Sequence, residues 1–362
     1  MEEEWDMEGF YEGERVMPKG HQERRKVVRE MIKKPEVQVA ELPEDPSLET
    51  QFPNATVGMV IETTSGRCKV SADGEMIDCF LRGILQKQEG GYSNVVAVGD
   101  RVEISLDGDG SGVIEKVLPR RSVLSRTAGS SLGRASGQRQ IVAANVDRVL
   151  IVVSWQKPQF WPELVDRYLI AADRNQLEAV ICVNKIDLIE DQAEFESALK
   201  PYRDLGYIVL STSAEDKTGI NILREFLSGE ITVLAGMSGV GKSSLLSAVQ
   251  PGLNLKTLEV GERGKNKNQG RHTTRLASYY PLSGGGAVID TPGIRDFDLT
   301  GLEREEIKSF YPEFTKLSAN CGFSDCLHLS EPDCAVRDGI EKGTVSQLRY
   351  ENYTKIIACM RE

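Results

Sequence analysis

The chain has 362 residues, of which 40% are hydrophobic and 27% charged, a composition that favours a soluble globular protein of two or three domains. No apolar run approaches the roughly 18 residues of a membrane-spanning helix, so we expect no membrane partner. The net charge of −11 does not exclude nucleic acid, because residues 1–50 hold 14 acidic and 8 basic side chains whereas residues 116–139 hold six basic and no acidic ones, and local potential governs contact with phosphates.

Residues 1–54 are predicted to be an N-terminal extension rather than a domain. They contain a short charged helical segment near Gln22–Lys33 and then a Pro/Glu-rich run through Pro53, which is typical of a solvated, disordered tail. The acidic start, Met1–Asp6, differs from a secretory or transit peptide. We therefore expect a cytoplasmic protein, with the plastid stroma as the alternative if a targeting segment was removed.

Five short runs of high β propensity follow in residues 55–119, separated by turn signals such as Ala72-Asp73-Gly74. Five strands in so short a segment predict a small closed barrel, for which an oligonucleotide-binding (OB) fold is the leading interpretation and an SH3-like barrel the alternative. The predicted strands are Thr56–Glu62, Arg67–Ser71, Met76–Leu81, Arg101–Leu106 and Gly112–Val117.

Residues 120–145 are rich in Arg, Ser, Gly and Gln and are interpreted as a basic connector. In residues 146–299 apolar strands alternate with helical patterns, of which Pro162–Arg174 is the first. This alternation predicts an α/β domain whose parallel sheet is covered on both faces. The predicted strands are Val146–Ser154, Ala179–Val183, Tyr207–Leu210, Thr232–Leu234 and Ala287–Ile289.

A phosphate-binding loop is predicted between the strand near residue 233 and a helix at Ser243–Val249. Residues 236–243 match G-x-x-x-x-G-K-[ST], in which glycines let backbone N–H groups wrap the phosphates and the helix N-terminus adds a favourable dipole. Lys242 would pair with the β- and γ-phosphates, and Ser243 would ligate Mg²⁺. The residues expected to bind the nucleotide here are Gly236, Met237, Ser238, Gly239, Val240, Gly241, Lys242, Ser243 and Ser244.

The segment Asn184-Lys185-Ile186-Asp187 follows another predicted strand, at the carboxyl end, where ligands bind in open α/β sheets. The Asp187 carboxylate can accept two hydrogen bonds from guanine N1 and N2, a pair that adenine lacks, and the stem of Lys185 can cover the base. Ser213 and Ala214 follow the next strand and suit backbone donation to guanine O6. Together with the phosphate loop, these residues predict GTP rather than ATP as the ligand.

The segment Asp290-Thr-Pro-Gly293 ends the last predicted strand. Asp290 fits a water-mediated contact with Mg²⁺, and the Gly293 N–H fits a contact with the γ-phosphate. Residues 264–275 are basic and Gly/Asn-rich, and one threonine there, Thr273 or Thr274, would complete the Mg²⁺ shell when γ-phosphate is present. The guanine motif precedes the phosphate loop, so the motif order is circularly permuted relative to a Ras-like GTPase. Such a permutation can preserve the same site, because domain termini often lie close together.

Residues 300–362 are helical in pattern and are interrupted by a cluster of three cysteines and one histidine, namely Cys321, Cys326, His328 and Cys334. Three thiolates and one imidazole form a closed tetrahedral set for one structural Zn²⁺, which leaves no position for a catalytic water. The other four of the seven cysteines are scattered. Such clustering indicates a metal site in a reducing compartment rather than disulfides.

Across residues 55–345, the barrel, the permuted GTPase motifs and the C-x4-C-x-H-x5-C spacing together resemble the RsgA/YjeQ family of GTPases that act on the small ribosomal subunit. The resemblance implies an OB-fold, contact with 16S-type rRNA and late maturation of the 30S subunit, with subunit-stimulated GTP hydrolysis driving release. It also implies that His272 positions the catalytic water, since aliphatic Ile294 stands where other GTPases carry Gln, and that Thr274 is the switch threonine, with Thr273 as the alternative. Residues 1–54 fall outside the family pattern.

The expected function is therefore a ribosome-stimulated GTPase, a monomer, that uses GTP/GDP with Mg²⁺ and holds one structural Zn²⁺. One alternative is a GTP-binding scaffold or regulatory switch that acts on a non-ribosomal partner. Another is a nucleotide-dependent enzyme acting on a small substrate, which is disfavoured because no second acid–base or nucleophile constellation lies beyond the phosphate site.

Overall fold

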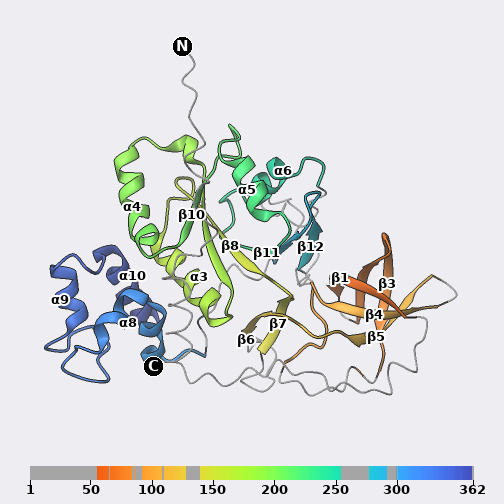
Figure 1. Cartoon of the computed structure of the whole chain (residues 1–362), viewed down its shortest axis with the longest axis horizontal. Helices are drawn as coiled ribbons and strands as arrows, with labels where there is room; N and C mark the ends of the chain where they lie inside the picture. The colour runs from red at the N-terminus through yellow and green to blue at the C-terminus, as the bar shows by residue number, and fades with distance from the viewer. Residues whose placement is uncertain are drawn as a thin grey trace, which may run out of the picture.

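In the computed structural model the described residues are 55–64, 66–83, 85, 92–107, 110–127, 139–253, 277–291, 299 and 301–360. They form a β-barrel, a central α/β part and a C-terminal helical module, which follow one another across the molecule (Figure 1). The predicted N-terminal extension, residues 1–54, lies outside the described residues.

The barrel has five strands, which hydrogen-bond in the order β1-β2-β3-β5-β4, and a further pairing of β1 with β4 closes it. β3 and β5 run parallel, whereas the other pairs are antiparallel. Side chains alternate between interior and surface, as in β2, where Cys68, Val70 and Ala72 are buried. The closed five-stranded barrel of OB type is thus confirmed. Its strands are β1 (Thr56–Thr64), β2 (Arg67–Ala72), β3 (Glu75–Leu81), β4 (Arg101–Leu106) and β5 (Gly112–Val117).

The predicted basic connector contains two strands that its composition did not indicate. β6 (Val123–Thr127) and β7 (Arg139–Ala144) pair antiparallel as a separate two-stranded sheet. Leu124 and Ala143 from these strands are buried in the core of the α/β part. The connector and its bounds stay a prediction; its two strands escape a reading of composition because buried positions here are few and lie among Arg, Ser and Gln.

The α/β part has a sheet with the strand order β10-β9-β8-β11-β13-β12. Its strands are parallel except β12, which pairs antiparallel with β13 at the sheet's end. The strands are β8 (Arg148–Ser154), β9 (Glu178–Asn184), β10 (Ile208–Ser211), β11 (Ile231–Ala235), β12 (Ser278–Pro281) and β13 (Ala287–Asp290). The helices are α3 (Pro162–Arg174), the 3-10 helix η4 (Ile186–Leu188), α4 (Gln192–Asp204), α5 (Ile220–Leu227) and α6 (Lys242–Val249).

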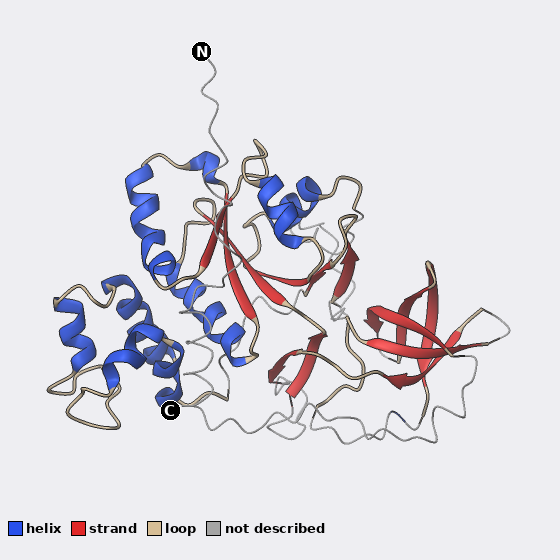
Figure 2. Cartoon of the chain, in the orientation of Figure 1, coloured by secondary structure: helices blue, strands red, loops and turns tan. Residues whose placement is uncertain are grey.

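Helices cover both faces of this sheet, as predicted (Figure 2). On one face α3 and α4 pack against β8, β9, β11 and β13 through residues such as Tyr168 and Leu199. On the other face α5 and α6 pack through residues such as Leu223 and Leu245. Successive side chains of each parallel strand therefore enter different cores, which explains why these strands read as continuous apolar runs.

The barrel and the α/β sheet are joined by hydrogen-bonded strands into one eleven-stranded sheet, because β12 pairs with β1 at Ser278 and Glu62. Gly99 lies at the same junction with φ 88°, and its carbonyl accepts a 2.8 Å hydrogen bond from Asn145 Nδ2. An added Cβ at Gly99 would lie 2.3 Å from the Ala144 carbonyl oxygen. The two parts are therefore in close backbone contact.

The C-terminal module is helical, as predicted, and the Cys/His cluster lies between its second and third α-helices. Its apolar core also includes Ile170 of α3, so the module packs on the α/β part. Among the described residues, no helix is both long and apolar enough to cross a lipid bilayer. The elements are α7 (Arg304–Ile307), η5 (Lys308–Phe310), α8 (Pro312–Ser318), α9 (Ala335–Glu341) and α10 (Gln347–Cys359).

Candidate nucleotide site and metal centre

The predicted phosphate loop connects β11 to the N-terminus of α6, at the carboxyl edge of the parallel sheet. Gly236, Gly239 and Gly241 have φ values of 142°, 84° and 94°, a region that side chains other than glycine rarely adopt. An added Cβ at Gly236 would lie 2.2 Å from the Val152 carbonyl oxygen, and one at Gly241 would lie 2.3 Å from Asn184 Nδ2. The glycines are thus required by both backbone conformation and close packing.

Lys242 and Ser243 begin α6, where the helix dipole favours anions. The Lys242 ammonium donates hydrogen bonds of 2.7 Å to the carbonyls of Gly236 and Met237. The lysine therefore lies along the loop, with its charge where the phosphates of a nucleotide are expected.

The guanine motif lies against the phosphate loop. Asn184 ends β9 with 1% of its surface exposed, and its Nδ2 donates to the Val240 carbonyl at 2.9 Å. The Lys185 ammonium donates to the Gly239 carbonyl at 2.7 Å. Two side chains of the guanine motif therefore bind directly to the backbone of the phosphate loop, although more than 50 residues separate the partners along the chain.

Asp187 and Ser213 are brought together by the same strand ends. The Ser213 hydroxyl donates a 2.6 Å hydrogen bond to Asp187 Oδ1, and the Ala214 N–H donates to Asn184 Oδ1 at 3.2 Å. Asp187 is exposed, whereas Ser213 is fully buried. Ser213 therefore holds the Asp187 carboxylate at an accessible edge of the sheet, where a planar base can reach it.

Burial lowers the pKa of Lys185. The nearby Lys157 ammonium lowers this pKa further, whereas the Asp187 carboxylate raises it. The Lys185 ammonium also donates a hydrogen bond to the Lys157 carbonyl. Lys185 is therefore held by two loops at once, the phosphate loop and the segment that follows β8.

That segment, Trp155–Trp161, is part of the site but was not predicted. The Ser154 hydroxyl donates a 2.6 Å hydrogen bond to the Pro158 carbonyl, and Pro158 Cδ lies 3.7 Å from where a Cβ of Gly239 would be. No familiar motif marks the segment. The signal that would have found it is topological: β8 lies between β9 and β11, so the loop after it must lie between the two predicted motifs.

Asp290 ends β13, next to the strand that carries the phosphate loop. The two strands are parallel, with Asp290 opposite Leu234, and Asp290 is 4% exposed. This position fits the predicted water-mediated contact with Mg²⁺. The other predicted residues, His272, Thr273, Thr274 and Gly293, lie outside the described residues together with Ile294, and their roles stay predictions.

The four predicted metal ligands converge in the helical module. Their donor atoms all lie within 4.8 Å of one another. His328 Nδ1 lies 3.6, 3.3 and 3.5 Å from the sulfurs of Cys321, Cys326 and Cys334. The other ring nitrogen, Nε2, lies 3.0 Å from the Ser318 hydroxyl, which orients the ring. A closed set of three sulfurs and one nitrogen fits structural Zn²⁺.

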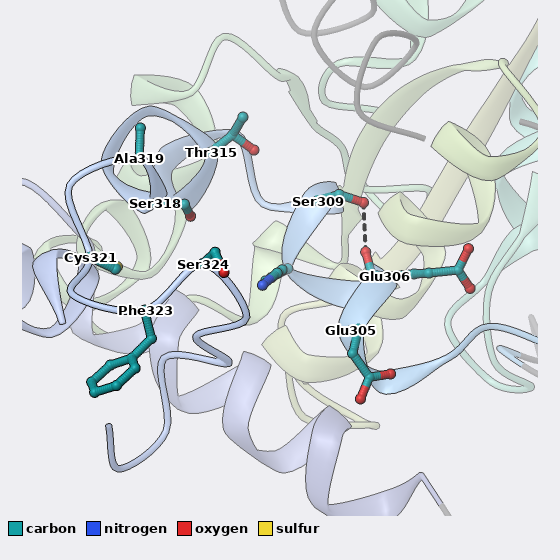
Figure 3. A pocket seen from close by; sticks show the side chains of 10 residues that line it. Glu305, Glu306, Ser309, Thr315, Ser318, Ala319, Cys321, Phe323 and Ser324 are labelled. Carbon is teal, nitrogen blue, oxygen red and sulfur yellow. Dashed lines mark hydrogen bonds between the residues drawn. The ribbon is translucent and has the colours of Figure 1, made fainter. Parts of the chain in front are cut away.

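A pocket of about 700 Å³ borders this cluster (Figure 3). Ser318 and Cys321 lie on one wall and Ser309 on the other. Cys321 is the one ligand of the four that is not fully buried. The pocket therefore belongs to the metal module and not to the nucleotide motifs. It is lined by Glu305, Glu306, Lys308, Ser309, Thr315, Ser318, Ala319, Cys321, Phe323 and Ser324.

Two family models match the chain. Residues 57–114 match the RsgA N-terminal domain, and residues 117–300 match the RsgA GTPase. The two matches cover the barrel and the α/β part.

Proteins named small ribosomal subunit biogenesis GTPase RsgA are similar over most of their length. The one from Moorella thermoacetica is 41% identical over 301 residues, covering 83% of this chain and 96% of that protein. The one from Thermotoga petrophila is 39% identical over 307 residues, covering 83% of this chain and 95% of that protein.

Solved structures agree with these matches. The crystal structure of YjeQ from Thermotoga maritima superposes with a TM-score of 0.65 at 36% identity, covering 85% of this chain and all of that one. YloQ, a circularly permuted GTPase, superposes with a TM-score of 0.62 at 31% identity, covering 84% and 94%.

Proposed function

The chain belongs to the RsgA family of GTPases, and we propose that it hydrolyses GTP in the site between residues 184–187 and 236–244 while it assists maturation of the small ribosomal subunit. The observation that carries the proposal is the pair of hydrogen bonds from Asn184 and Lys185 to the carbonyls of Val240 and Gly239. Because they join the guanine motif to the phosphate loop, one nucleotide can span both.

In this proposal the base stacks beside the Lys185 stem, with its N1 and N2 donating to Asp187. Ser213 and Ala214 lie near guanine O6, and the backbone of residues 236–244 wraps the phosphates. Lys242 leaves its two loop carbonyls for the β- and γ-phosphates, and a bound Mg²⁺ would neutralise developing charge on them.

The Mg²⁺ would be held by Ser243 and, through water, by Asp290, with Thr274 completing the shell in the GTP state. Gly293 would donate to the γ-phosphate, and His272 would orient the attacking water. Because His272 and Thr274 lie close together in the sequence, we expect one partner contact with residues 264–275 to act on both and to accelerate hydrolysis.

The partner proposed is the 30S subunit with its 16S-type rRNA, bound by a monomer of this protein in the cytoplasm. The names of the relatives supply the subunit, and the barrel of OB type supplies a fold that commonly binds oligonucleotides. Hydrolysis to GDP and phosphate then weakens binding and drives release. The Cys321–Cys334 cluster would hold one Zn²⁺ with a structural role.

Cosedimentation with 30S subunits, with phosphate release measured in parallel, tests this function. We expect salt-sensitive binding with a non-hydrolysable GTP analogue, weaker binding with GDP, and hydrolysis accelerated by the subunit. Lys242→Ala should lose nucleotide binding, with exposed Lys200→Ala as the control.

Two results would contradict the proposal. If Lys242→Ala hydrolysed GTP at the wild-type rate, the assignment of the nucleotide site to residues 236–244 would be wrong. A hydrolysis rate that is the same with and without 30S subunits would favour a switch or scaffold for a different partner.

A further inference from the structure

Helix α10 lies between the metal cluster and the nucleotide-binding part, and it is bonded to both. On one side it packs against α3, where the helical module meets the α/β part (Figure 1). On the other side the Tyr350 hydroxyl donates to the His328 carbonyl at 2.8 Å, and the Tyr353 hydroxyl donates to the Leu327 carbonyl at 2.6 Å. The metal-binding segment Cys321–Cys334, called the metal loop here, is therefore hydrogen-bonded directly to α10.

The contact with α3 is a buried cluster of charges around Arg349, which is 1% exposed. Its Nη1 donates to Asp166 of α3, and its Nε donates to Glu313 of α8 at 2.9 Å. Asn352, one turn along α10, donates to the other Asp166 oxygen at 2.9 Å. Buried charges of this kind tolerate little displacement, because an unpaired charge in the interior is costly.

Arg349 also contacts α4, so it touches the helices that follow β8 and β9. Its guanidinium carbon lies 5.5 Å from the ring centre of Tyr202 in α4. The Tyr202 hydroxyl donates to the Pro162 carbonyl at the start of α3. α3 and α4 are therefore hydrogen-bonded to each other, and the Arg349 guanidinium contacts both helices.

The path from these helices to the nucleotide site is short. Asp166 lies five residues after Trp161, where the Trp155–Trp161 segment ends. The carbonyl of Lys157 in this segment accepts a hydrogen bond from Lys185, which also binds the phosphate loop. α3, the Trp155–Trp161 segment and Lys185 therefore form a continuous connection that ends on the phosphate loop.

We propose that α10 couples the metal module to the guanine site, with Arg349 and Asn352 as positioning residues that set nucleotide affinity through α3. A partner that moves the metal module would then change how tightly the protein holds GDP or GTP. This inference rests on the proposed function, because it assumes that the Lys185 site binds guanine nucleotide.

The test measures the affinity of the full chain for a fluorescent GDP analogue. Arg349 itself is not replaced, since unpaired Asp166 and Glu313 would endanger folding. Asn352→Leu removes the hydrogen bond to Asp166 of α3. The double variant Tyr350→Phe with Tyr353→Phe removes the two hydrogen bonds to the carbonyls of His328 and Leu327 in the metal loop. Lys355→Ala, exposed on the same helix, is the matched control.

We expect GDP affinity to fall about fivefold or more in Asn352→Leu and in the tyrosine double variant, with no change in Lys355→Ala. In steady state the GTP KM should rise while kcat changes little. By reciprocity, GDP should slow hydrogen exchange of α10 amides in the wild type more than in Asn352→Leu.

A merely structural role predicts a different result: a lower unfolding temperature with unchanged GDP affinity well below that temperature, and this would overturn the coupling. If the wild-type protein failed to bind the GDP analogue, the proposed function would fail instead. The two failures are thus distinguishable in one titration series.

Discussion

Asp187 is an exposed carboxylate whose position is fixed by a buried serine, and this arrangement makes the residue a test of base selectivity. Asp187→Asn should weaken GTP binding by about 1.5–3 kcal/mol, the usual worth of hydrogen bonds to a charged group. Xanthosine triphosphate, which carries a carbonyl in place of the guanine amine, should gain affinity because an amide can donate to it.

Competition binding with GTP and xanthosine triphosphate measures this change, with exposed Glu190→Gln as the control. An unchanged preference for GTP would mean that Asp187 does not contact the base.

His272 is the residue that the family resemblance assigns to the attacking water. His272→Ala should keep GTP affinity and lose about 10²-fold in turnover, because the attacking water would no longer be held in position. Single-turnover hydrolysis together with equilibrium binding separates the two quantities, and Asn268→Ala provides a control from the same stretch. Equal losses of binding and turnover would assign His272 to nucleotide binding.

At the scale of elements, the cysteine cluster predicts a metal-dependent module. One Zn²⁺ per chain is expected, and its removal by a chelator should lower the unfolding temperature, because the binding energy of a structural zinc is part of the folding energy. Cys326→Ser should lose the metal, whereas Cys359→Ser should retain it, since Cys359 is exposed and outside the cluster. Elemental analysis and thermal unfolding check both. Equal zinc content in the two variants would exclude the cluster as the site.

The elements that the sequence predicts best are those stabilised by residues nearby in the chain and those buried on both faces. The helix Pro162–Arg174 was predicted with its observed bounds, because Pro at the first turn and a strong apolar face mark it. The strands β8, β9 and β11 were visible as continuous apolar runs between two cores.

Elements fixed by distant partners were not predictable. β12, Ser278–Pro281, is four residues long and is a strand because β13 and β1 pair with it. β6 and β7 acquire buried positions by packing on distant segments, since Leu124 and Ala143 enter the α/β core and Val98 pairs with Ala143. Likewise, the Trp155–Trp161 segment has no phosphate-binding motif and joins the site through a backbone carbonyl, which any residue possesses.

At the scale of the whole molecule, Gly99 provides a test of the junction between the barrel and the α/β sheet. Gly99→Ala should destabilise the protein by about 1–3 kcal/mol, because the new methyl group would meet the Ala144 carbonyl at 2.3 Å. Gly74→Ala is a matched control: its φ of 83° is similar, but nothing lies within 4 Å of the added Cβ.

Urea unfolding of both variants separates backbone strain, which they share, from the clash, which only Gly99→Ala has. Similar losses in the two would show that the close contact at the junction contributes little to stability.

The strand order of the central sheet also has a consequence for synthesis. β8, β9 and β10 leave the ribosome before β11, although β11 pairs with β8 in the finished sheet. During translation the side of β8 that later pairs with β11 is therefore an unpaired edge of an apolar strand. Such edges aggregate or recruit chaperones. Asn184 and Lys185 are therefore translated before residues 239 and 240, whose carbonyls they bind in the folded protein.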